Sequence, residues 1–249
     1  MKGDVALIVG AGAGTSASCA RTFADAGFSV AVAARNPEKA ELKKLEDDFG
    51  ATRFGCDAAD EAAVADLFSS LDENLGTLRV VIHNIDGRTQ DIFRKTITEA
   101  PAEAARQTLL GSAFSAFLVG QQAAARMLKN EPDENGARGT IIFTNASAAM
   151  KGFARSGAFA MACQAKQGLA QSMARELMPQ GVHVAHVPID AAIGRVRDDG
   201  TRAHWAAGET VDDNMAHPEE IAKAYLALHQ QHRSTWAFEM VLRPWTERW

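Results

Sequence analysis

Short apolar runs alternate with longer alanine-rich stretches along the whole chain, and this alternation limits the fold more than any other property of the sequence. Seven runs have the apolar and β-branched composition that is typical of buried strands. They occupy residues 4–9, 29–34, 52–56, 78–83, 139–145, 182–187 and 236–242. Strands that alternate with helices favour a parallel sheet with helices on both of its faces.

The stretches between these runs have the apolar spacing of helices, near residues 15–26, 37–49, 60–74, 99–130, 156–178 and 218–231. Asn36 before Pro37 predicts a capped helix start, while Pro179 and Gly181 predict a helix end. No linker rich in glycine, serine or proline divides the chain. We therefore predict one doubly wound α/β domain over residues 1–249, with a polar, lid-like segment at 190–217.

Composition excludes several classes of function. The chain has 26 Lys and Arg against 31 Asp and Glu, so it lacks the basic excess of a nucleic-acid or anionic-membrane surface. No apolar run approaches the ~20 residues of a membrane helix, and the N-terminus lacks a signal-peptide layout. The cysteines, Cys19, Cys56 and Cys163, are far apart and without metal-ligand spacing. We expect a cytoplasmic protein without a metal, nucleic-acid or membrane partner.

A glycine-rich turn follows the first apolar run directly. It contains Gly10, Gly12 and Gly14, and Thr15 and Ser16 begin the next helical stretch. Such a turn lets backbone N–H groups and the positive end of a helix face a pyrophosphate without obstruction by Cβ atoms. The strand–turn–helix context therefore predicts a dinucleotide site, and a tight turn without a ligand is the alternative.

Two charged residues after the next apolar runs bear on which dinucleotide would bind. Arg35 ends the second run, where an arginine suits the 2′-phosphate of NADP(H) and an acid would suit NAD(H). A solvated cation is the alternative interpretation. Asp57 follows the third run and is placed either to accept a hydrogen bond from the adenine amine or to cap the next helix.

Together these segments resemble the short-chain dehydrogenase/reductase family. The matching segments are VGAGAG (9–14), AARNPEKAE (33–41), CDAADEAAVADL (56–67), VVIHNIDG (80–87), GTIIFTNASAA (139–149) and SMARELMPQGVHV (172–184). The resemblance implies one Rossmann-like domain with seven parallel strands, NAD(P)-dependent oxidation of alcohols or reduction of carbonyls in a small-molecule substrate, and homodimers or homotetramers. It adds Asn84, Ile189 and Ile193 to the cofactor-binding residues and puts Ser16 where the family has a third glycine.

The family's catalytic residues are absent at the matching positions. Its tyrosine position falls on Phe159, its lysine position on Cys163, its serine position on Ala146 and its asparagine position on Ser112. The resemblance is thus to an atypical subgroup that lacks the catalytic Tyr and Lys and also carries Phe at the tyrosine position. Ordinary Tyr/Lys carbonyl reduction is predicted to be absent or replaced by an altered mechanism.

Two nearby residues are candidate substitutes. Ser147 follows the serine position, and Lys166 lies one helical turn beyond Cys163. Because lysine is rarely buried unpaired, a solvated helix lysine is the favoured interpretation of Lys166. Tyr225 is the one tyrosine of the chain and is expected to pack, as is His186, within an apolar run.

Two functions are compatible with this sequence. The first is an NADP(H)-binding oxidoreductase of altered mechanism, whose substrate lies under the segment 190–217. That segment contains Arg195, Arg197, His204 and Trp205, which suit an anionic or aromatic substrate; a solvated, mobile lid is the alternative interpretation. The second is a non-catalytic dinucleotide-binding module that acts as a sensor or a partner subunit.

Overall fold

The computed structural model of the protein describes residues 3–196, 201–204 and 214–248. Its central sheet has six parallel strands in the order β3-β2-β1-β4-β5-β6. They are β1 (Asp4–Val9), β2 (Ser29–Ala34), β3 (Thr52–Gly55), β4 (Thr77–His83), β5 (Gly139–Ala146) and β6 (Val182–Ile189). The predicted doubly wound α/β class is confirmed.

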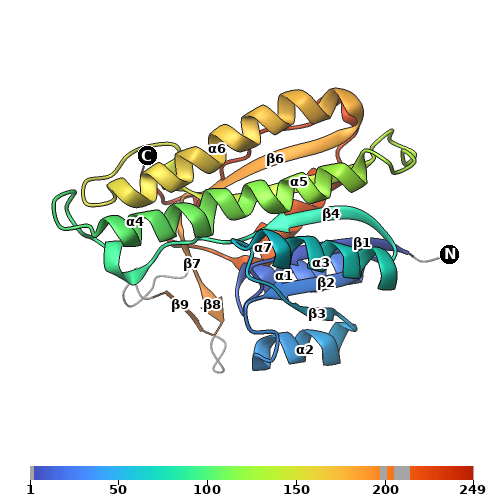
Figure 1. Cartoon of the computed structure of the whole chain (residues 1–249), viewed down its shortest axis with the longest axis horizontal. Helices are drawn as coiled ribbons and strands as arrows, with labels where there is room; N and C mark the ends of the chain where they lie inside the picture. The colour runs from blue at the N-terminus through green and yellow to red at the C-terminus, as the bar shows by residue number, and fades with distance from the viewer. Residues whose placement is uncertain (1–2, 197–200, 205–213, 249) are drawn as a thin grey trace.

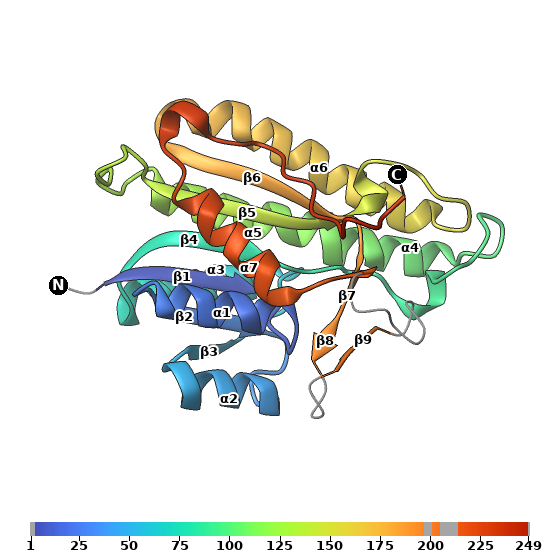
Figure 2. The same cartoon turned by 180° about the vertical axis from the view of Figure 1, so that it is seen from behind.

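Helices cover both faces of the sheet (Figures 1 and 2). One face carries α1 (Thr15–Asp25), α2 (Ala40–Phe49) and α7 (Pro218–His229). The other carries α3 (Glu61–Asn74), α5 (Ser115–Met127) and α6 (Gly157–Leu177). Helix α4 (Ala102–Leu109) continues through a π-helical turn at Leu110–Phe114 into α5, so the predicted stretch 99–130 is one helical path with a local widening.

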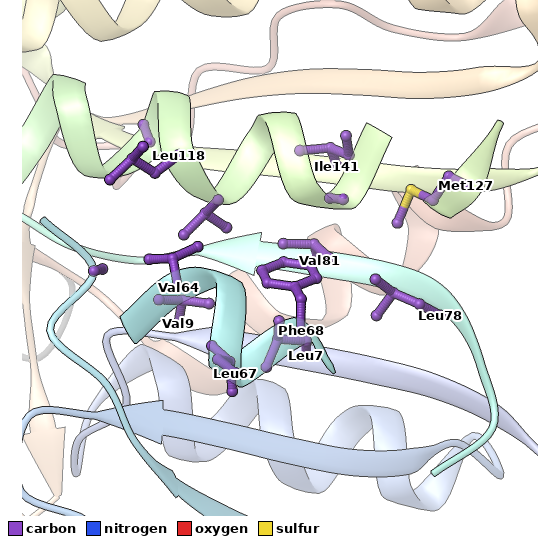
Figure 3. Packing of buried hydrophobic residues seen from close by; sticks show 14 of the residues in the cluster. Leu7, Val9, Val64, Leu67, Phe68, Leu78, Val81, Leu118, Met127 and Ile141 are labelled. Carbon is purple, nitrogen blue, oxygen red and sulfur yellow. The ribbon is translucent and has the colours of Figure 1, made fainter. Parts of the chain in front are cut away.

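Alternation along each strand builds the two halves of the core. In β1, Leu7 and Val9 face the layer of α3, α5 and α6, whereas Ile8 faces the layer of α1, α2 and α7. Figure 3 shows Phe68 and Leu67 of α3 against Leu7 and Val81 in the first of these clusters. Because both faces of the sheet are buried, the strands are almost continuously apolar.

The prediction of a seventh strand is wrong, because residues 236–242 do not form a continuous strand. Residues 236–242 run beside β6, where the N–H of His186 donates to Phe238 O (2.7 Å) and that of Met240 to His186 O (3.1 Å). Further on, Leu242 donates to the carbonyl of Pro188 (3.0 Å). Proline has no N–H with which to continue the ladder between these bonds. The segment therefore forms isolated bridges to β6, and the sheet has six strands.

Between β6 and α7, the described residues include four short strands that pair with one another. β7 (Ala192–Ile193) pairs with β10 (Met215–Ala216), and β8 (Arg195–Val196) pairs with β9 (Arg202–Ala203). Arg197 and Trp205, expected in the lid-like segment, lie outside the described residues. Within the described ranges, no helix has the length and apolar character needed to cross a membrane.

Helix ends test two local predictions. Helix α6 ends at Leu177, and Gly181 has φ +90°, so the predicted stop is confirmed. The start predicted at Asn36 is wrong, because α2 begins only at Ala40. The Asn36 side chain instead accepts a hydrogen bond from the N–H of Glu38 (3.0 Å), which closes a turn ahead of the helix.

Tyr225 packs in the core as expected, fully buried, with its hydroxyl 2.7 Å from Thr144 Oγ1. We expect Tyr225→Phe to lower the free energy of unfolding by about 1 kcal/mol, because the Thr144 hydroxyl loses a buried partner. Tyr225→Ala should cost about 3–5 kcal/mol through the cavity it leaves. Urea unfolding measures both. Equal stability of the wild type and the Phe variant would contradict the role of this hydrogen bond.

Candidate cofactor and active site

A cavity of about 900 Å³ lies at the carboxyl ends of β1, β4, β5 and β6. The turn after β1, the loop after β4, the end of β5 and the inner face of α6 contribute to its lining. Ligands of open α/β sheets bind at this edge, outside the carboxyl ends of the strands. The position of the cavity follows from the parallel order of the sheet.

The glycine turn forms one wall of this cavity. The N–H groups of Gly10 and Ala11 donate to Ala33 O at 3.0 and 2.9 Å, which ties the turn to the end of β2. Gly10 has φ +90°, and a Cβ on it would lie 2.5 Å from Asn84 O. Gly12, in contrast, faces open space. The turn is thus closed toward the sheet and open toward the cavity, which fits a dinucleotide pyrophosphate.

Ser16 is buried inside this turn. Its hydroxyl donates to Gly10 O (2.9 Å) and accepts from Asn84 Nδ2 (2.7 Å). Ser16 therefore links the turn after β1 to the loop after β4.

Most of the predicted cofactor residues line the same cavity. These are Gly10, Gly12, Gly14, Thr15, Ser16, Asn84, Ile189 and Ile193. Arg35 and Asp57 are exposed and are not among the residues that line the cavity. They follow the ends of β2 and β3, which pair with each other at Ala34 and Gly55. The alternative that Asp57 caps α3 is wrong: Asp60 caps it by accepting from Ala63 N (2.8 Å), and Asp57 accepts from Ala59 N.

Lys166 is buried in the cavity wall, so its interpretation as a solvated lysine is wrong. The side chain is 1% exposed, and Nζ donates to Ile85 O (2.8 Å) and Thr144 O (3.3 Å). Burial lowers the pKa of Lys166 from 10.5 to about 8, although Cys163 and Asp86 act in the opposite direction. Two carbonyl partners explain how an ammonium is tolerated here.

Phe159 and Cys163, which the sequence resemblance places at a tyrosine and a lysine position, lie on α6 and carry no charge near pH 7. Phe159 is buried, and the Arg88 guanidinium carbon lies 4.5 Å from the centre of its ring. Burial raises the pKa of Cys163 to about 11, so its thiol is neutral near pH 7. Ala146 and Ser147 line the cavity beside them, whereas Ser112 is buried in the π-helical turn outside that lining.

Three polar side chains beside the cavity form a hydrogen-bonded network that was not predicted from the sequence. Asn145 Nδ2 donates to Cys163 O (2.8 Å) and to His186 Nε2 (2.9 Å), and His186 Nδ1 donates to Glu239 Oε2 (2.9 Å). Burial lowers the pKa of His186, which keeps the ring neutral and suits these roles. His186 is thus a satisfied core histidine, as expected. The sequence feature that could have indicated this network is a polar residue near the end of each of two apolar strands, Asn145 in β5 and His186 in β6.

Comparison with known proteins decides the family. A family model described as enoyl-(acyl carrier protein) reductase matches residues 10–237. The chain belongs to the short-chain dehydrogenase/reductase family. The chain is 28% identical to the 3-oxoacyl-[acyl-carrier-protein] reductase MabA of Mycobacterium avium over 200 residues, which cover 79% of the chain and 71% of MabA.

Two solved structures show the same fold. A short-chain dehydrogenase from Rhodopseudomonas palustris is 30% identical, with a TM-score of 0.78 over 97% of this chain and 99% of that one. A metagenomic short-chain oxidoreductase in complex with NADP is 21% identical, with a TM-score of 0.77 over 99% of each chain. Among the residues that the structure describes, no cluster of three His, Cys, Asp or Glu could hold a metal ion.

Substitution by alanine is predicted to have different effects at Gly10 and at Gly12, although both belong to the same turn. Gly10→Ala should destabilise the fold by about 2 kcal/mol or more, because its φ and the Asn84 carbonyl both exclude a Cβ. Gly12→Ala should leave the free energy of unfolding almost unchanged and weaken dinucleotide binding, since its Cβ would enter open space. Urea unfolding and calorimetric titration with NADP+ measure the two effects. Unchanged NADP+ affinity in Gly12→Ala would contradict this assignment.

The buried ammonium predicts a rise in stability at alkaline pH. Between pH 8 and 10.5 the unfolded chain holds a proton on Lys166 that the folded chain has released, so the free energy of unfolding increases with pH. The full difference corresponds to roughly 3 kcal/mol. Lys166→Met should remove this rise, which urea unfolding at several pH values measures. Identical pH profiles of the wild type and the variant would refute the lowered pKa.

Proposed function

We propose that the protein is an NADP(H)-dependent oxidoreductase in which Lys166 moves the proton that the family's tyrosine normally moves. One observation carries this proposal: a buried ammonium lines the same cavity as the glycine turn, held by the carbonyls of Ile85 and Thr144. A reaction between carbonyl and alcohol requires a proton at the substrate oxygen, and Lys166 is a suitable donor.

The glycine turn and the loop after β4 would hold the dinucleotide. Gly12 leaves room for the pyrophosphate, and Asn84 is positioned by Ser16. Arg35, exposed at the end of β2, favours the 2′-phosphate of NADP(H) over NAD(H). The metagenomic neighbour that was solved with NADP supports a nicotinamide dinucleotide as the cofactor. When bound, the cofactor supplies the hydride of the reaction.

Lys166 has the chemistry for the proton step. An ammonium has three hydrogens, and two of them are directed at Ile85 O and Thr144 O. The third is available for a substrate oxygen in the cavity. With a pKa of about 8, the protonated form predominates at neutral pH and the neutral amine is still accessible. Lys166 can therefore donate the proton in reduction and accept it in oxidation.

We also propose that the usual Tyr and Lys are lost and replaced. Phe159 has no ionisable proton, and the neutral thiol of Cys163 supplies no positive charge. Ser147, from the residues after β5, lines the cavity and supplies a hydroxyl that can orient a carbonyl oxygen. The roles of the family's tyrosine and serine thus pass to Lys166 and Ser147.

Two further properties of the family are carried over as proposals. We propose a homodimer or homotetramer, which the exposed and mutually stacked rings of Phe114 and Phe117 support. We propose a cytoplasmic location, which suits three buried cysteines that are all free thiols.

The proposal predicts that Lys166→Met lowers the rate of carbonyl reduction about 100- to 10,000-fold, the usual contribution of a positioned general acid. The measurement is NADPH oxidation with a panel of aldehydes and ketones. Lys223→Met, an exposed lysine of α7 paired with Glu220, is the matched control and should retain wild-type rates. In the wild type, the rate of reduction should fall as the pH rises through about 8, because the donor loses its proton.

The alternative is a non-catalytic dinucleotide-binding module, and a restored variant separates the two. Phe159→Tyr with Cys163→Lys rebuilds the family's pair on one face of α6. If the variant turns over and the wild type does not, while both bind NADP+, the protein is a non-catalytic module and the enzyme hypothesis is wrong. Equal rates in the wild type and Lys166→Met would show that this lysine donates no proton.

A further inference from the structure

Two arginines have a strained backbone at the edge of the cavity. Arg94 and Arg155, with φ of 55° and 61°, are the non-glycine residues with positive φ in the part of the chain that the structure describes. Residues with a Cβ rarely adopt this conformation, and it persists where the surrounding structure enforces it. Such positions cluster at ligand-binding sites, which makes these two arginines candidates for a binding role.

The two arginines belong to loops that meet at one end of the cavity. Arg155 Nε donates to the backbone oxygen of Arg94 at 2.9 Å, although 61 residues separate them. Figures 1 and 2 show the loop before α4 and the loop before α6 side by side at that end. Phe93 and Phe153 line the cavity in the same loops. The Arg94 guanidinium carbon lies 5.4 Å from the centre of the Phe93 ring.

Positive charge dominates the wall of the cavity. Its described lining contains Arg88, Arg94, Arg155, Lys166 and Arg195 against one acid, Asp86. Asp86 pairs with Arg88 at 3.2 Å. Among the described residues, neither Arg94 nor Arg155 forms an ion pair, and the nearby acid Glu99 is held by the N–H and hydroxyl of Thr96. Within the described ranges, Glu99 acts on Arg155 only as a nearby charge, and neither guanidinium is neutralised by a direct ion pair.

Arg94 and Arg155 lie away from the end of the cavity that faces the glycine turn. Arg195 Nε lies 4.0 Å from the position of a Cβ on Gly14, so Arg195 belongs to the phosphate end of the cavity. Arg94 and Arg155 instead belong to loops that carry aromatic side chains, and Phe159 with Arg88 lies on the same cavity wall. A guanidinium fork recognises carboxylate and phosphate groups through paired hydrogen bonds.

We propose that Arg94 and Arg155 bind the anionic group of the substrate, a carbonyl compound that carries a carboxylate or phosphate and an aromatic or apolar body. The body packs against Phe93 and Phe159 while its carbonyl group faces Lys166. This assignment rests on the proposed reductase function for the identity of the reacting group. The anion site itself stands on the two arginines and can be tested without turnover.

The test compares three aldehydes that differ in one group: 4-formylbenzoate, 4-formylphenyl phosphate and the neutral 4-formylbenzamide. Each is titrated calorimetrically into protein saturated with NADP+, or into the free protein if NADP+ does not bind. We expect the wild type to bind at least one anion about 10- to 100-fold more tightly than the amide, as charge-assisted hydrogen bonds predict. The ratio between the two anions distinguishes a carboxylate substrate from a phosphate one.

Arg94→Asn combined with Arg155→Asn should abolish this preference. Asparagine tolerates a positive φ, so the variant removes charge without adding backbone strain. Arg175→Asn, on the exposed surface of α6, is the matched control and should keep the preference. Equal affinity of the wild type for all three compounds, including no binding of any, would overturn the proposal. A double variant that loses NADP+ affinity but keeps the preference would overturn it as well, since the arginines would then serve the cofactor.

NADPH oxidation with the same three aldehydes separates this proposal from the proposed function. A preference for the anions in binding without any turnover supports the anion site and counts against the reductase. Turnover of all three at equal efficiency supports the reductase and refutes the anion site.

Discussion

The close contact between Gly10 and the backbone of Asn84 joins the two halves of the site. Parallel pairing of β1 with β4 brings the glycine turn and the loop after β4 to one edge of the sheet, and no Cβ fits between them. Ser16 reinforces the contact through hydrogen bonds to Gly10 and Asn84. The next carbonyl in that loop, Ile85 O, accepts the Lys166 ammonium. A displaced turn would therefore disturb the nucleotide wall and the buried cation together.

Burial decides the chemistry of the ionisable groups around this contact. Removal from water lowers the pKa of Lys166 and raises that of Cys163, so the lysine becomes able to exchange a proton and the cysteine stays inert. The chain of Asn145, His186 and Glu239 holds neighbouring backbone through neutral partners and one partly exposed carboxylate. The cavity is thus organised by backbone carbonyls and burial, with a single acid, Asp86, among the described residues of its wall.

The ring of Phe159 has a structural role of its own. Phe159 packs with Ile92, Ala148 and Cys163 in a small cluster, and the Arg88 guanidinium lies on its ring. A phenol there would gain a nearby cation that favours its ionised form. Burial opposes this effect, as it does at Cys163, where the pKa is raised despite the nearby Arg88.

Local periodicity determined most of the fold from the sequence alone, because apolar alternation and glycine turns act over a few residues. The six strands, the glycine turn and the absence of a tyrosine at position 159 were all readable in this way. The broken seventh strand was not, since it depends on Pro188 lying opposite residues 236–242. Lys166 was misjudged for the same reason: its partner Ile85 lies 81 residues away, and only the folded chain removes the side chain from water. The meeting of Arg94 with Arg155 likewise belongs to the tertiary structure, which brings two distant loops together and enforces a backbone conformation that neither loop's sequence signals.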